Sequence, residues 1–121
     1  MQQQLTARHL KISELIKRSV ASLFSIDKIF DHIISSCSLS VTEVRMSQDF
    51  KYADIYIYCY DVESPRHVIE FLNAQSKHVG YLLAKSIKLR KMPSLKFIYD
   101  ASLDKASKID DVLASLNNNI S

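Results

Sequence analysis

Glycine is the most restrictive feature of this sequence, because the chain contains a single one, Gly80, in 121 residues. An average composition would supply about eight. Several functional motifs need closely spaced glycines, since only a residue without a Cβ atom fits their turns and lets a phosphate approach the backbone. The dinucleotide-binding GxGxxG loop, the P-loop and the G-x-S-x-G nucleophile elbow are therefore excluded.

Length and composition predict one domain, covering residues 1–121, with a hydrophobic core of normal size. Two independent cores would each be marginal at half this length, and 47% of the residues are hydrophobic, as in ordinary globular proteins. No stretch approaches the roughly 20 apolar residues of a membrane span, and residues 1–8 lack the apolar segment of a secretory signal. We therefore expect a soluble, cytoplasmic protein.

The two cysteines, Cys37 and Cys59, are in no spacing that would hold zinc. Cys59 falls on the apolar face of a predicted strand, where a reduced thiol behaves as a small hydrophobic side chain. We interpret both as structural thiols and expect no metal site.

Alternation of apolar and polar residues predicts a hairpin. Residues 52–60 alternate throughout, and a turn at residues 48–51 joins them to an earlier strand at residues 39–47. In that earlier strand the apolar phase slips between Val41 and Val44, which indicates a β-bulge or a stretch covered on both faces.

Helices are expected before and after this hairpin. Helical spacing of apolar residues predicts one helix over about residues 6–24, whereas residues 25–38 fit either a loop or a short helical turn. After the hairpin, Ser64 is a candidate N-cap with Pro65 at the first helical position. A further helical segment is expected over about residues 79–89.

The last predicted elements are a strand and a helix. Pro93 ends the preceding helical segment, and alternating apolar residues follow at Leu95, Phe97 and Tyr99. Because a helical crossover separates this third strand from the hairpin, we expect it to pair in parallel with one hairpin strand. A C-terminal helix is expected over about residues 104–117, before a frayed tail.

This order of elements (helix, strand, strand, two helices, strand) is the topology of a type II KH domain. The expected fold class is thus α+β, a two-layer sandwich with a three-stranded sheet and helices packed on one face. Its core would cover about residues 6–103. Ordinary KH domains clamp a nucleic-acid backbone with a GxxG loop, which a chain with one glycine lacks.

Positive charge is concentrated in one part of the sequence. Between positions 77 and 96 the chain has six basic residues and no acidic one, although its net charge is only +3. On a helix, one face of this segment would carry a basic stripe with one aromatic residue, made of Lys77, Tyr81, Lys85 and Lys88. Such a stripe is either a solvated surface or a site for RNA phosphates, and the lack of acids to pair with along the helix favours RNA.

Other basic residues are weaker candidates for RNA contact. Arg90, at the end of the same segment, could equally cap the last helix carbonyls. The remaining candidates are Lys91, Arg8, Lys11 and Arg45. Tyrosines on the polar face of residues 52–60 could stack on bases, but their strand propensity explains them better.

The sequence gives little support to an enzyme. Its four histidines are scattered, and none shares a motif with a cysteine or an evident serine nucleophile. Paired acids such as Asp110 and Asp111 are commonly just solvated. We expect no catalysis, no cofactor and no small-molecule substrate.

Two stretches of the sequence carry a family signature. The first, at the hairpin, reads Val41-x-x-Val44-x-Met46-Ser47-x-Asp49-x-x-x-Ala53-x-Ile55-Tyr56-Ile57. The second, around the third strand, reads Leu89-Arg90-x-x-Pro93-x-Leu95-x-Phe97-x-Tyr99-Asp100-x-Ser102. In this order and spacing they resemble the ribosome-binding factor A family over roughly residues 8–116.

The resemblance implies an RNA-binding assembly factor for the small (30S) ribosomal subunit and its 16S rRNA. It further implies a role in late subunit maturation, 5′-end processing of the rRNA and cold adaptation, by a monomer without cofactor or catalysis. In this family a helix–kink–helix with an Ala-x-Gly kink replaces the GxxG loop, and the corresponding positions here are Gln75-Ser76-Lys77. The alternative function is a KH-like protein-interaction module without RNA binding.

Overall fold

The computed structural model describes residues 6–26, 38–60 and 64–102. In these ranges the chain forms, in order, α1 (Ala7–Ile26), β1 (Ser38–Met46), β2 (Tyr52–Tyr60), α3 (Pro65–Ala74), α4 (Ser76–Ser86) and β3 (Ser94–Tyr99). The order and the approximate bounds of these elements agree with the sequence-based prediction. The predicted helix at residues 104–117, Cys37 and most of the ambiguous segment 25–38 lie outside the described residues.

The three strands form one mixed sheet in the order β1-β2-β3. β1 and β2 are antiparallel, and their register shifts between Val41 and Glu43, which leaves Thr42 as the extra residue of a bulge. β2 and β3 are parallel, so that Tyr52 at the start of one faces Ser94 at the start of the other. Of the two explanations that the sequence left open for the phase slip, the structure shows the bulge, and the predicted parallel pairing is confirmed.

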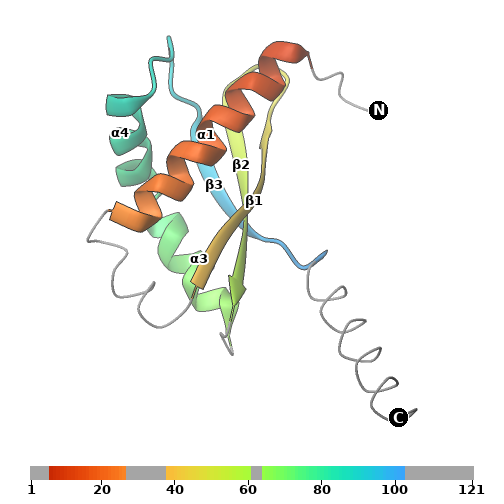
Figure 1. Ribbon diagram of the computed structural model, residues 1–121, viewed down its shortest axis with the longest axis vertical. Helices are drawn as coiled ribbons and strands as arrows, with labels where there is room; N and C mark the ends of the chain where they lie inside the picture. Colours follow the sequence, from red (N-terminus) through yellow and green to blue (C-terminus); the bar gives the residue numbers. More distant parts are fainter. Residues whose placement is uncertain (1–5, 27–37, 61–63, 103–121) are drawn as a thin grey trace, which may run out of the picture.

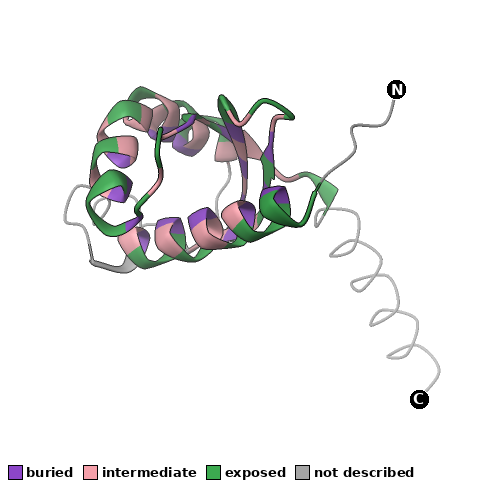
Figure 2. Cartoon of the chain, turned by 90° about the horizontal axis from the view of Figure 1, so that it is seen from above, coloured by how far each residue is buried: buried purple, intermediate pink, exposed green. Residues whose placement is uncertain are grey.

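The helices pack against one face of the sheet and enclose a single core (Figure 1). Their buried faces turn inward, as the colouring of Figure 2 shows. Alternate residues of β2 enter this core, among them Ala53, Ile55 and Ile57, each with no exposed surface, and Cys59 is buried beside them. The predicted α+β two-layer sandwich with a KH-like arrangement is thus confirmed.

A kink of one residue separates α3 from α4. Gln75 lies between the helices with φ −97° and ψ 6°, and its N–H donates to the carbonyls of Phe71 and Leu72 at 3.1 Å. These angles are accessible to any L-residue, so the kink requires no glycine. Gly80 itself lies inside α4 without a positive φ, and therefore has no conformational role of the kind that a GxxG loop needs.

The C-terminal end of α4 differs from the prediction. The helix ends at Ser86 and not near Leu89, because Ile87 is extended (φ −112°, ψ 124°) and buries its side chain in the core. The Ile87 N–H still donates to the Leu83 carbonyl at 2.8 Å, which closes the helix. Lys88 therefore does not belong to the helical stripe that the sequence predicted, and Arg90 does not cap the helix from within it.

At the start of α3, Ser64 occupies the predicted N-cap position with Pro65 at the first helical residue, but the Ser64 side chain makes no capping hydrogen bond. Among the described residues, no helix combines the length and the hydrophobicity that a bilayer span requires. The same residues contain no group of three or more His, Cys, Asp or Glu side chains placed to hold a metal ion.

Candidate nucleic-acid interface

Three segments far apart in the sequence meet where β2 and β3 begin. Because these strands are parallel and in register at their first residues, the segments that precede them lie side by side. The Ser94 N–H accordingly donates to the Lys51 carbonyl at 2.9 Å. The first turn of α1 reaches the same end of the sheet, where His9 Nε2 bonds to the Gln48 carbonyl at 3.0 Å.

The turn between β1 and β2 is fixed by its own polar groups. The Asp49 carboxylate accepts hydrogen bonds from the Ser47 hydroxyl at 2.7 Å and from the Lys51 N–H at 3.1 Å, and these bonds lower the pKa of Asp49. The Phe50 N–H donates to the Ser47 carbonyl at 3.0 Å. Phe50 adopts φ 60°, in the left-handed region that a bulky side chain rarely occupies.

A buried histidine holds Phe50 in place. The His9 and Phe50 rings stack with centroids 4.0 Å apart and planes 15° from parallel, and His9 is only 4% exposed. Since the Gln48 carbonyl can only accept, Nε2 of His9 carries a proton, and Nδ1 accepts from the Thr6 N–H at 3.1 Å. The guanidinium carbon of Arg8 also lies 5.0 Å from the Phe50 ring centroid.

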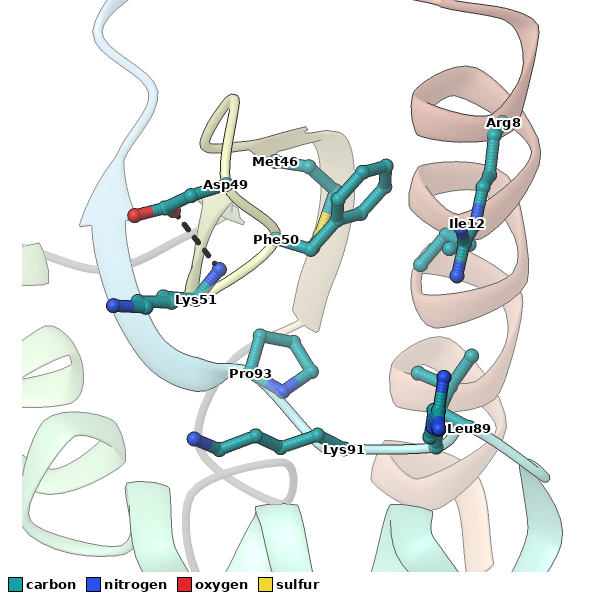
Figure 3. Close-up of a pocket in the computed structure, with 10 residues that line it drawn as sticks. Arg8, Ile12, Met46, Asp49, Phe50, Lys51, Leu89, Lys91 and Pro93 are labelled. Atoms are coloured by element: carbon teal, nitrogen blue, oxygen red, sulfur yellow. Dashed lines mark hydrogen bonds between the residues drawn. The ribbon is translucent and has the colours of Figure 1, made fainter.

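These segments enclose a cavity of about 240 Å³, here called the basic hollow (Figure 3). Its residues are Arg8, Ile12, Met46, Asp49, Phe50, Lys51, Leu89, Arg90, Lys91 and Pro93. Four of them are cationic and one is acidic. Figure 3 shows Phe50 pointing toward Ile12 and Arg8 of α1, whereas the side chains of Lys51 and Lys91 extend away from α1.

A second cavity, of about 460 Å³, lies along α4 and is here called the α4 groove. It is lined by Ser76, Lys77, Gly80, Tyr81, Ala84, Met92, Pro93, Ser94 and Leu95. The Lys85 ammonium lies 4.5 Å from the Tyr81 ring centroid, as a cation–π pair would. Because Pro93 lines both cavities, the two adjoin at the segment that leads into β3.

A sequence model of the family described as ribosome-binding factor A matches residues 8–113 of this chain. The chain belongs to this family. It is 34% identical to ribosome-binding factor A of Brucella ovis over 112 residues, which are 92% of this chain and 75% of the relative. It is 33% identical to that of Methylobacterium nodulans over 110 residues, which are 91% of this chain and 82% of the relative.

Solved structures of ribosome-binding factor A share the fold. The crystal structure of the Thermus thermophilus protein superposes with a TM-score of 0.63 at 22% identity, and covers 75% of this chain and 94% of that one. A homology model of Thermus thermophilus ribosome-binding factor A, fitted into a cryo-EM map of a 30S complex, gives a TM-score of 0.59 at 20% identity, and covers 74% of this chain and 91% of that one.

The structure divides the predicted RNA-binding residues among several places. Arg8, Arg90 and Lys91 come together in the basic hollow, although they come from two distant parts of the chain. Lys77 lines the α4 groove, and Lys85 lies over Tyr81 beside it.

The other candidates line neither cavity. Lys88 is exposed in the segment after α4, and Lys11 is exposed on α1. Arg45 lies on the side of the sheet away from the helices, since its neighbours in β1 point into the core, and it pairs with Glu43 at 3.0 Å. The Arg45 guanidinium carbon is also 5.1 Å from the Tyr56 ring centroid.

Sequence reasoning missed Lys51 and His9. Lys51 could have been found from the predicted parallel pairing, which places the residue before β2 next to the residues before β3. His9 gave no signal, because its partners, Thr6 aside, lie about 40 residues away in the β1–β2 turn.

Proposed function

We propose that this protein binds the small ribosomal subunit through its 16S rRNA and acts as an assembly factor in late subunit maturation, including rRNA 5′-end processing. Membership of the ribosome-binding factor A family supports this proposal, as does the 30S complex of the Thermus thermophilus relative. The proposal extends to a monomeric cytoplasmic protein with a part in cold adaptation.

The observation that carries the proposal is the group of exposed cations in the segment between α4 and β3. Lys88, Arg90 and Lys91 are exposed in this segment, where the basic hollow and the α4 groove adjoin. Phosphates of a single polynucleotide could contact both cavities, because the cavities share Pro93 as a common wall. Such contacts give affinity that depends on salt and little on base identity.

This binding mode replaces the clamp of an ordinary KH domain. The kink at Gln75 has no glycine-rich loop to bring its backbone close to a phosphate, so side-chain cations have to supply the contacts. The proposed role is one of binding and requires neither a cofactor nor a small-molecule substrate.

The test is co-sedimentation of the protein with isolated small subunits at increasing salt. We expect binding that weakens linearly on a logarithmic scale as salt rises, with a slope set by the number of phosphates contacted. Absence of binding even at low salt would refute the proposal and favour a protein-interaction module without RNA binding.

A pair of variants assigns the contacts. Lys77→Gln with Lys88→Gln should reduce the salt slope by about one unit for each phosphate that the protein no longer neutralises. Arg66→Gln with Lys96→Gln removes the same charge from surfaces outside both cavities and should leave the slope unchanged. Equal slopes for the two double variants would place the phosphate-binding residues elsewhere on the protein.

A further inference from the structure

We propose that the basic hollow is a subsite for one unpaired nucleotide, whose base enters the apolar floor while its flanking phosphates meet the surrounding cations. This inference rests on the proposed function and deepens it. The subsite would let the protein distinguish an RNA segment with an accessible base from a fully paired one, which phosphate contacts alone cannot do.

The floor of the hollow suits a flat, apolar group of limited size. It is formed by five apolar side chains, of which Met46 and Pro93 are buried and the rest half-buried: Ile12, Met46, Phe50, Leu89 and Pro93. At about 240 Å³ it is smaller than the ~300–1,000 Å³ of pockets for drug-sized ligands, and therefore fits a single base. His9 covers one face of the Phe50 ring, and the Arg8 guanidinium lies 5.0 Å from the ring centroid, so the wall offers an aromatic ring and a guanidinium side by side. Unstacked bases pack on both kinds of group.

The charges around the hollow suit phosphates on both sides of such a base. Arg8 approaches from α1, Lys51 from the turn, and Arg90 and Lys91 from the segment before β3. The one acid, Asp49, is already engaged by the Ser47 hydroxyl and the Lys51 N–H within its own turn. A peptide made of acidic residues alone would satisfy the cations but has no planar apolar group to fill the floor, whereas a nucleotide carries both the charge and the planar group.

The hollow is also preorganised. A phenylalanine at φ 60° costs energy that glycine would avoid, and it persists only where the surrounding structure determines it. Here the hydrogen bonds of the turn and the stacked His9 ring impose that conformation and direct the Phe50 side chain toward α1 (Figure 3). A fixed wall reduces the ordering cost of binding a base.

The experiment compares two single-stranded RNAs of about six nucleotides, a length within one binding site. One is an adenosine oligonucleotide, and the other is the same backbone with its inner bases removed. Fluorescence anisotropy with the full chain should give tighter binding of the intact RNA by roughly 5- to 150-fold, the range expected for one stacked base. Equal affinity for the two RNAs would overturn the subsite.

A variant that fills the hollow without changing its charge provides the matched test. Ile12→Phe places a larger side chain in the floor and should abolish the preference for the intact RNA while leaving affinity for the abasic RNA unchanged. Leu89→Phe fills the same space from a loop and replaces it if Ile12→Phe does not fold. A preference for intact RNA that survives a folded filling variant would overturn the proposal.

Three further measurements separate the alternatives. Adenosine monophosphate that saturates the hollow more tightly than the RNA would identify a free nucleotide as occupant and overturn the RNA subsite. A poly-glutamate peptide serves as a competitor. With the wild type, the intact RNA should resist displacement more than the abasic RNA, and equal displacement of the two would also overturn the RNA subsite. If the preference for intact RNA is absent but the protein still binds small subunits, only the subsite is refuted. If the preference and small-subunit binding are both absent, the proposed function is refuted as well.

Discussion

The Asn73 side chain completes the free edge of β3, and its removal should destabilise the whole domain. Asn73 Nδ2 donates to the Phe97 carbonyl at 2.9 Å, and the Phe97 N–H donates to Asn73 Oδ1 at 2.8 Å. In a strand, the N–H and C=O of one residue point to the same side, so this single side chain pairs both groups of Phe97 as a neighbouring strand would. It also joins α3 to the edge strand at Phe97, whose side chain is buried in the core.

The expected cost of Asn73→Leu follows from these two bonds. Each of the two hydrogen bonds contributes about 0.5–1.5 kcal/mol to stability. Their loss also leaves the Phe97 N–H and C=O unpaired, which adds a desolvation penalty that partial access of water reduces. Because Asn73 is half-buried, we expect a total loss of about 2–3 kcal/mol in the free energy of unfolding. With a typical urea m-value, this shifts the denaturation midpoint by about 1–2 M.

The assay is urea denaturation followed by circular dichroism, with native-state hydrogen exchange of the Phe97 amide as a local readout. His67→Leu is the matched control, since it introduces the same side chain at an exposed position of α3 and should change stability by less than about 0.5 kcal/mol. If Asn73→Leu costs no more than this control, or if the Phe97 amide keeps its protection, the edge-pairing argument is refuted.

Two further predictions concern Gly80 and Asp100. Gly80→Ala should stabilise the protein by about 0.5–1 kcal/mol, because Gly80 lies inside α4 without a positive φ. An added Cβ would meet only Leu95 Cδ1, at 4.0 Å. A lower midpoint of thermal unfolding in the variant would contradict this prediction. The hydroxyls of Ser102 and Thr42 donate hydrogen bonds to the Asp100 carboxylate and lower its pKa. The carboxylate therefore adds stability to the folded protein at pH values above the ordinary aspartate pKa of about 4. This stability is lost as the pH falls through the lower pKa that Asp100 has in the folded protein. Urea denaturation of the wild type and of Asp100→Asn should therefore show the largest difference in stability at neutral pH and a smaller one in acid. A difference that does not depend on pH would argue against stabilisation by the ionised Asp100 carboxylate.

Most of the fold could be predicted because its patterns are local. The strict alternation of residues 52–60 identified the central strand, and the phase slip in β1 located the bulge that the structure places at Thr42. The parallel pairing of β3 followed from the length of the crossover alone. In these cases the apolar residues recur with a fixed period in the sequence because one face of the element is buried in the core.

The end of α4 could not be predicted in this way. Residues 79–89 keep a helical spacing of apolar residues, yet the helix ends at Ser86, and Ile87 enters the core from an extended backbone. The core that Ile87 joins is built from elements far apart in the sequence, and no local signal records it. The consequence for function is direct, since Lys88, Arg90 and Lys91 leave the helix and lie on the segment where the two cavities adjoin.

The candidate site was predictable in charge but not in shape. The run of six cations without an acid indicated a surface for a polyanion, and that statement requires no structure. The basic hollow, however, depends on the turn before β2 and the segment before β3 starting at the same end of the sheet, and on His9 fixing Phe50 from a third segment. A sequence pattern can locate each of these segments but cannot show that they enclose one cavity.

The single glycine now has a specific meaning for how the protein would bind RNA. A KH domain with a GxxG loop uses backbone groups at the kink between its helices, where the position of the phosphate is fixed by the fold. Here the kink at Gln75 is an ordinary helical bend, and the only glycine lies inside α4 where nothing demands it. Lysine and arginine side chains that bind phosphates can be replaced one at a time without changing the backbone. Affinity should therefore decline gradually as cations are removed, whereas the preference for RNA with an accessible base should depend on the basic hollow alone and disappear in one step when the hollow is filled.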